Sequence, residues 1–132
     1  MAVILIADDD AQIRAMIQKL LARAGHTVIE AANGVEAEDL AGRHPIDLLI
    51  TDIIMPDKEG LMLVRDLKRR SPKLRIIAMS GGGRAGAFTL LDAAAQFGAD
   101  AVLRKPFRAG ALLEAIASAL GNGGKATAAG ES

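Results

Sequence analysis

The stretch Leu48–Pro56 constrains the fold more than any other part of the chain. It is an almost wholly apolar, largely β-branched run that contains one acid, Asp52, and ends in a proline. Because the run is short and Pro45 and Pro56 bracket it, the pattern predicts a buried strand rather than a helix. Strands that are buried on both faces belong to parallel sheets covered by helices above and below. Asp52 is therefore expected at the carboxyl end of a central strand, where open α/β sheets place their ligand chemistry.

The rest of the chain alternates between short apolar runs and longer segments with helical spacing. The apolar runs predict strands at Val3–Ala7, Thr27–Ala31, Leu48–Thr51, Leu74–Met79 and Ala101–Arg104. The other segments predict helices after Asp10, from Asn33 to about Arg43, from about Gly60 to before Pro72, from about Gly86 to Phe97, and around Leu112–Leu120. This strict alternation predicts an α/β fold, a doubly wound parallel sheet with the common strand order 2-1-3-4-5.

Length and composition indicate one domain and exclude several kinds of site. The chain has 132 residues, and we expect a domain at 1–120 and a flexible, Gly/Ala-rich tail at 121–132. Lys+Arg and Asp+Glu balance at 16 each, so no basic excess favours nucleic-acid binding. The chain has no cysteine, which excludes disulfides and thiolate metal sites. The N-terminal apolar run is too short for a signal peptide or a membrane span, so we expect a cytoplasmic protein without membrane contact.

Acidic side chains follow two strands that are neighbours in the predicted order. Asp8 and Asp9 follow the first strand, and Asp52 follows the third. Carboxylates this close repel one another, an arrangement that is tolerated where a cation is held. Oxygen ligands with room for water suit Mg²⁺. Asp10, in contrast, is expected to be the N-cap of the next helix.

A hydroxyl and an amine follow the two remaining strands of this half of the sheet. Ser80 comes after the fourth strand and Lys105 after the fifth. A hydrogen-bond donor and a compact positive charge are the complements of a phosphoryl group. Together with a carboxylate and a hard cation, they indicate an aspartyl-phosphate site.

From Val3 to Leu120 the chain resembles the receiver domain of CheY-like response regulators, in its single-domain form. The matching pieces are Asp8-Asp9 as the acid pair, Asp52 with Met55-Pro56 and Gly60 as the phosphoacceptor strand and its loop, Ser80 as the switch hydroxyl, and Lys105-Pro106-Phe107 as the lysine turn. Each piece alone is a weak signal, but the full set in this order and spacing is specific.

The resemblance implies a flavodoxin-like fold and a role in two-component signalling. Asp52 would take a phosphoryl group from the phosphohistidine of a sensor histidine kinase or a phosphotransfer protein. Mg²⁺ would be held by Asp9, Asp52 and the Ile54 backbone carbonyl, and by Asp8 through water. The Lys105–Pro106 bond would be cis. The domain would be a phosphoprotein that assists its own phosphorylation and dephosphorylation, not a metabolic enzyme, and would bind a downstream protein through the face formed by its fourth helix, fifth strand and fifth helix.

Three features depart from the family pattern. Val102 stands where family members usually have Tyr or Phe, which puts the usual coupling between hydroxyl and aromatic ring in doubt. The segment between Ser80 and Lys105 is longer and richer in glycine than is typical. Ile54 and Gly82 lack a polar group that could position an attacking water, so we expect the aspartyl phosphate to hydrolyse slowly.

Two other functions remain open from the sequence. The first is a degenerate receiver that acts as an interaction domain without being phosphorylated. The second is a small nucleotide-binding module, because Gly81, Gly83 and Gly86 form a G-x-G-x-x-G pattern with Asp100 about 20 residues beyond it. That acid precedes the fifth strand, however, whereas a ribose-binding acid belongs at the carboxyl end of its strand.

Overall fold

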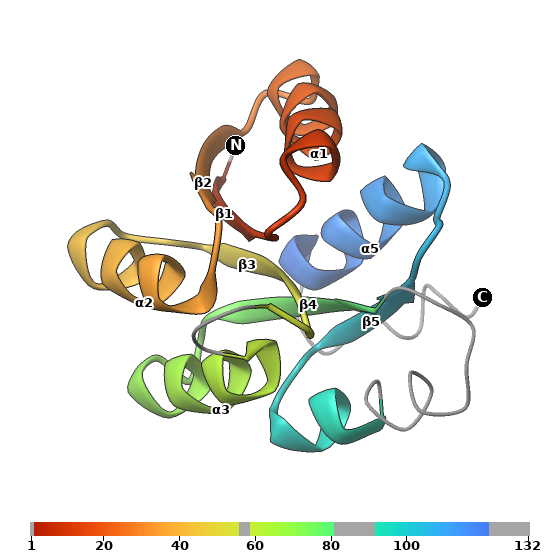
Figure 1. Cartoon of the computed structure of the whole chain (residues 1–132). Helices are drawn as coiled ribbons and strands as arrows, with labels where there is room; N and C mark the ends of the chain where they lie inside the picture. The colour runs from red at the N-terminus through yellow and green to blue at the C-terminus, as the bar shows by residue number, and fades with distance from the viewer. Residues whose placement is uncertain (1, 56–58, 81–91, 122–132) are drawn as a thin grey trace.

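The computed structural model describes residues 2–55, 59–80 and 92–121, which form one parallel sheet with helices on both faces (Figure 1). The strands are β1 (Val3–Ala7), β2 (Thr27–Ala31), β3 (Leu48–Asp52), β4 (Arg75–Ser80) and β5 (Ala101–Arg104). The helices are α1 (Ala11–Arg23), α2 (Gly34–Arg43), α3 (Gly60–Arg70) and α5 (Ala109–Gly121), and residues 92–97 are helical as well. The sheet order β2-β1-β3-β4-β5 confirms the predicted doubly wound fold.

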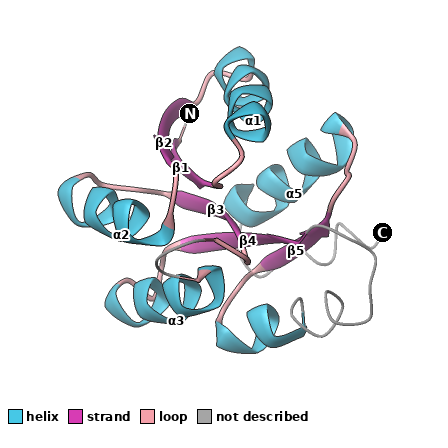
Figure 2. Cartoon of the chain, viewed as in Figure 1, coloured by secondary structure: helices cyan, strands magenta, loops and turns pink. Residues whose placement is uncertain are grey.

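Helices cover both faces of the sheet, as Figure 2 shows, with α1 and α5 on one face and α2 and α3 on the other. Side chains alternate along β1: Ile4 and Ile6 pack in the cluster that contains α1 and α5, and Leu5 and Ala7 in the cluster that contains α2 and α3. Burial on both faces explains why the strands are almost continuously apolar. Among the described helices, none is long and apolar enough to cross a membrane.

The strand register brings the ends of four strands to one edge of the sheet. Ala7 at the end of β1 lies opposite Thr51 of β3, and Ser80 at the end of β4 lies opposite Arg104 of β5. The residues that come next in the sequence therefore share this edge, which we call the carboxyl edge. The opposite edge, where the same strands begin, is the amino edge.

Helix capping follows the sequence signals closely. The Asp10 carboxylate accepts hydrogen bonds from the backbone N–H of Gln12 at 2.9 Å and of the next residue, so Asp10 is the N-cap of α1 as predicted. The Asn33 side chain accepts from the N–H of Glu36 at 2.8 Å and caps α2. The Glu36 carboxylate accepts a hydrogen bond from the N–H of Ala32, one residue before the cap. In a standard capping box it would accept from the N–H of Asn33 instead.

Two strand boundaries differ from the prediction by one residue. β3 continues through Asp52, because this residue still pairs with β4. β4 runs over Arg75–Ser80 and not Leu74–Met79, because the N–H of Leu74 donates within a turn instead. Asp52 and Ser80 are thus held by the sheet itself. Of the predicted helix from about Gly86 to Phe97, only residues 92–97 are described, and of the predicted tail only Gly121, which ends α5.

Gly60, the first residue of α3, is the point where this helix comes closest to β3. Its N–H donates to the carbonyl oxygen of Ile53 at 2.7 Å. A Cβ placed on Gly60 would overlap the carbonyl oxygen of Asp52 and would lie 2.6 Å from the Cα of Ile53. Only a residue without a side chain permits this approach.

We expect Gly60→Ala to lower the free energy of unfolding by about 2 kcal/mol or more, because the backbone of Asp52 or of α3 must shift. Gly42→Ala in α2 is the matched control, since a Cβ placed there would meet nothing within 4 Å. It should be neutral or stabilise by up to about 1 kcal/mol. Urea denaturation followed by circular dichroism measures both, and equal effects of the two substitutions would contradict the packing argument.

Candidate functional site

Three carboxylates meet at the carboxyl edge. Asp8 follows β1, Asp9 is its neighbour, and Asp52 ends β3, the strand beside β1. One oxygen from each lies within 4.8 Å of the other two. Asp8 is fully buried and Asp52 is 8% exposed, whereas Asp9 is exposed. The structure thus brings together the three acids that the strand order placed at this edge.

Lys105 brings a positive charge to the same point from the end of β5. Its Nζ lies 2.8 Å from Asp8 Oδ2 and 3.6 Å from Asp52 Oδ1. Its backbone N–H donates to the carbonyl oxygen of Ser80 at 2.7 Å, which joins the ends of β4 and β5. The Lys105–Pro106 peptide bond is cis, as expected.

The pKa of the Asp52 carboxyl is raised from its ordinary value of 3.8 to about 6. Burial is the main cause, since it disfavours the charged form. The ammonium of Lys105 opposes the rise, while the charges of Asp8 and Asp9 add to it, and the N–H of Ile53, which donates to Asp52 Oδ1 at 3.1 Å, opposes it slightly. Near pH 7 this carboxyl is therefore mostly ionised but is held in an unfavourable environment.

The donor set fits a magnesium ion. All side-chain ligands that the cluster offers are carboxylate oxygens, which Mg²⁺ prefers over nitrogen and sulfur. The exposure of Asp9 leaves one side of the cluster open to water, and Mg²⁺ commonly retains several waters. A divalent cation here would also offset the repulsion that raises the pKa of Asp52.

The remaining predicted site residues that the structure describes differ in their exposure. Ser80 is 1% exposed and ends β4 at the carboxyl edge. Ile54, two residues beyond Asp52, is 63% exposed. Val102, on β5, is 39% exposed. Gly82 lies outside the described residues.

Asp100 has a structural role, which weakens the nucleotide-binding alternative. Its Oδ2 accepts from the N–H of Ile76 at 2.8 Å and lies 3.0 Å from the Nζ of Lys68. These bonds hold it at the amino edge, far along the strand from where a ribose-binding acid is needed. The glycines of the G-x-G-x-x-G pattern, residues 81, 83 and 86, lie outside the described residues.

The sequence analysis assigned no role to Arg14, which lies in the first turn of α1. Its Nη1 donates to the backbone carbonyl oxygen of Asp8 at 2.8 Å, and its Nε lies 3.3 Å from Glu30 Oε1. One signal could have found it. A cation in the first turn of a helix is opposed by the helix dipole, so an arginine four residues after Asp10 would be favoured by a nearby acceptor.

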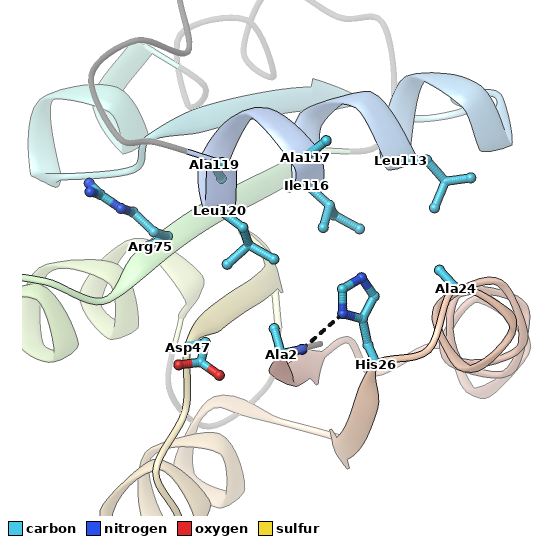
Figure 3. Close-up of a pocket in the computed structure, with 11 residues that line it drawn as sticks. Ala2, Ala24, His26, Asp47, Arg75, Leu113, Ile116, Ala117, Ala119 and Leu120 are labelled. Carbon is cyan, nitrogen blue, oxygen red and sulfur yellow. Dashed lines mark hydrogen bonds between the residues drawn. The ribbon is translucent and has the colours of Figure 1, made fainter.

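A groove of about 740 Å³ lies at the opposite, amino edge, between the start of the strands and α5 (Figure 3). Its walls are mainly small and aliphatic side chains, with His26, Asp47 and Arg75 among the lining residues. His26 Nδ1 accepts from the backbone N–H of Ala2 at 3.1 Å, and Asp47 Oδ2 from that of Val3 at 2.9 Å. The groove does not gather several carboxylates, so the chemistry predicted from the sequence belongs to the carboxyl edge.

A family model and similar proteins of known name point to the same family. A family model described as "Response regulator receiver domain" matches residues 4–117. The chain is 38% identical over 114 residues to the chemotaxis protein CheY of Bacillus subtilis (strain 168), covering 86% of this chain and 92% of CheY. It is 40% identical over 121 residues to the DNA-binding transcriptional regulator NtrC of Azospirillum brasilense, covering 90% of this chain but only 24% of NtrC, so it spans about a quarter of that relative.

The fold agrees with solved structures of the same kind. A response regulator receiver domain protein from Clostridium thermocellum superposes with a TM-score of 0.84 at 32% identity, covering 92% of this chain and 95% of that one. The family model spans most of the chain, and the strand order agrees with it. The chain therefore belongs to the CheY-like response regulator receiver domains of two-component signalling systems.

Proposed function

We propose that this receiver accepts a phosphoryl group on Asp52 from the phosphohistidine of a sensor histidine kinase or a phosphotransfer protein. The observation that carries the proposal is the convergence of three carboxylates and the ammonium of Lys105 on one point at the carboxyl edge. A nucleophilic carboxylate with a cation site and a fixed positive charge beside it is the constellation that phosphoryl transfer to an acid requires.

Each residue has a distinct part in the transfer. An Asp52 carboxylate oxygen bonds to phosphorus as the bond between phosphorus and the histidine nitrogen breaks, and the imidazole leaves. Asp9, Asp52 and the Ile54 backbone carbonyl would hold Mg²⁺, with Asp8 acting through water, and the bound ion would supply positive charge to the phosphoryl oxygens. The ammonium of Lys105 would bind a phosphoryl oxygen, for which its position within 3.6 Å of Asp52 Oδ1 is suited.

Switching would follow from a new competitor for Lys105 and Ser80. Lys105 now lies closer to Asp8, at 2.8 Å, than to Asp52. A phosphoryl group on Asp52 adds negative charge and acceptor oxygens, so it favours arrangements in which Lys105 and the hydroxyl of Ser80 turn toward it. Because the N–H of Lys105 is bonded to the carbonyl of Ser80, such a change reaches β5 directly. The face formed by the helix at residues 92–97, β5 and α5 would then bind the downstream protein.

We expect incubation with acetyl phosphate and Mg²⁺ to add one phosphoryl group to the wild type and none to Asp52→Asn, as measured by intact-mass spectrometry. Asp39→Asn, an exposed acid of α2, is the matched control and should be labelled like the wild type. Labelling of Asp52→Asn would place the acceptor elsewhere. An unlabelled but folded wild type that also fails to respond to beryllofluoride would favour the degenerate receiver.

The raised pKa of Asp52 predicts how stability depends on pH when Mg²⁺ is absent. The folded protein binds this proton more tightly than the unfolded chain, so the carboxyl lowers stability as the pH rises from about 4 to above 6. The full effect is up to about 3 kcal/mol. In EDTA, Asp52→Asn should therefore be more stable than the wild type at pH 7.5, and the difference should shrink toward pH 4. Urea denaturation at both pH values measures this, and equal stability at pH 7.5 would refute the prediction.

We expect Ser80→Ala to permit phosphorylation but to weaken the change that phosphorylation causes in β5 and α5. The reason is that the hydroxyl bonds the phosphoryl group in one of the two arrangements and not in the other. Amide NMR shifts of residues 101–121, with and without beryllofluoride, measure the change. Ser71→Ala, beyond the end of α3, is the control and should behave like the wild type. Undiminished shift changes in Ser80→Ala would remove Ser80 from the switch.

A further inference from the structure

We propose that Arg14 is a positioning residue for the cation site, and that Glu30 acts by orienting Arg14. The proposal rests on the Mg²⁺ site of the proposed function. Arg14 itself does not contact the ion. It holds the backbone between Asp8 and Asp9, and through this the directions of their carboxylates.

Arg14 links three elements at the carboxyl edge. It lies in the first turn of α1, and its side chain is 19% exposed. Its Nη1 donates to the carbonyl oxygen of Asp8, just beyond β1, at 2.8 Å. Its Nε lies 3.3 Å from the carboxylate of Glu30, in β2. The planar guanidinium can make these two contacts at once because its donors point in fixed directions.

With the hydrogen bond from Arg14 to its carbonyl oxygen, every polar group of Asp8 has a partner. The N–H of Asp8 donates to the carbonyl of Ala31 at 3.2 Å. Its Oδ1 accepts from the N–H of Asp10 at 2.9 Å, and its Oδ2 from Lys105 at 2.8 Å. Without Arg14, the carbonyl oxygen is the one group of Asp8 that loses its partner.

The orientation of this carbonyl matters for the neighbouring acid. The peptide unit between Asp8 and Asp9 is planar, so fixing its oxygen also fixes the plane from which the Asp9 backbone continues. Asp9 is exposed, and within the described part of the chain its carboxylate accepts no hydrogen bond. Its direction toward the cluster therefore depends on its backbone, which Arg14 helps to hold.

Positioning and charge predict opposite effects for the loss of Arg14. By Coulomb attraction alone, removing a positive charge beside three carboxylates should tighten Mg²⁺ binding. If Arg14 positions the ligands, its removal should weaken binding in spite of the more negative site. Residues that orient metal ligands typically contribute about 10-fold or more to metal affinity.

The test is Mg²⁺ titration of the unphosphorylated full chain by isothermal calorimetry, because the chain has no Trp or Tyr to report binding by fluorescence. We expect Arg14→Gln to raise the Kd about 10-fold. Arg14→Lys keeps the charge but loses the fork of donors, so it should raise the Kd as well. The double variant Arg14→Gln/Glu30→Gln has the net charge of the wild type, and its Kd should match that of Arg14→Gln, since Glu30 acts through Arg14.

Arg43→Gln is the matched control, because it removes the same charge and a 3.1 Å ion pair with Asp39 in α2. Its Kd for Mg²⁺ should equal that of the wild type.

The free energy of unfolding, measured in EDTA, separates positioning from general stability. A lower stability of Arg14→Gln with an unchanged or lower Kd for Mg²⁺ overturns the inference. If Arg14→Gln does not fold, the Kd for Mg²⁺ of Arg14→Lys and of Glu30→Gln, each compared with that of the wild type, tests the inference instead. A wild type that binds no Mg²⁺ overturns the proposed function as well, whereas wild-type binding that Arg14 variants retain overturns this inference alone.

Discussion

The ion pair between Lys105 and Asp8 is the interaction on which the site depends. Asp8 is fully buried, and a buried carboxylate without a partner destabilises a protein by several kcal/mol. Lys105 contacts it at 2.8 Å and reaches toward Asp52 as well. Among the described residues, one ammonium thus contacts two of the three acids that meet here. Such an excess of negative charge would favour a divalent cation.

Burial, with a smaller contribution from the charges of Asp8 and Asp9, disfavours the ionised form of the Asp52 carboxyl. The pKa of its carboxyl is raised to about 6, so the ionised form is held in an unfavourable environment. A cation beside Asp52 would offset this, and a phosphoryl group on Asp52 would offer Lys105 new acceptor oxygens. The hydrogen bond between the N–H of Lys105 and the carbonyl of Ser80 would link such a change to β5.

The backbone around the acids is held by hydrogen bonds and close packing on both sides of the cluster. Asp52 remains in the ladder with β4, and Gly60 lets α3 approach its carbonyl. On the other side of the crevice, Arg14 and the capping bond to Asp10 hold the segment after β1. A metal site needs ligands that are oriented before the ion arrives, and both sides of this candidate cation site are anchored by bonds to main-chain groups.

The strands, the helix caps and the meeting of the three acids could be predicted from the sequence, because they depend on local patterns. Apolar runs between helical segments determined the five parallel strands, and short polar residues determined the caps at Asp10 and Asn33. Since parallel strands align their ends, the strand order alone was enough to bring Asp8, Asp9 and Asp52 together. Tertiary structure decided the rest: which acid Lys105 pairs with, how far burial raises the pKa of Asp52, and that Arg14 reaches back to the Asp8 carbonyl. These depend on distances of a few ångströms between segments far apart in the chain, such as Asp8 and Lys105, which are 97 positions apart, and no local pattern specifies them.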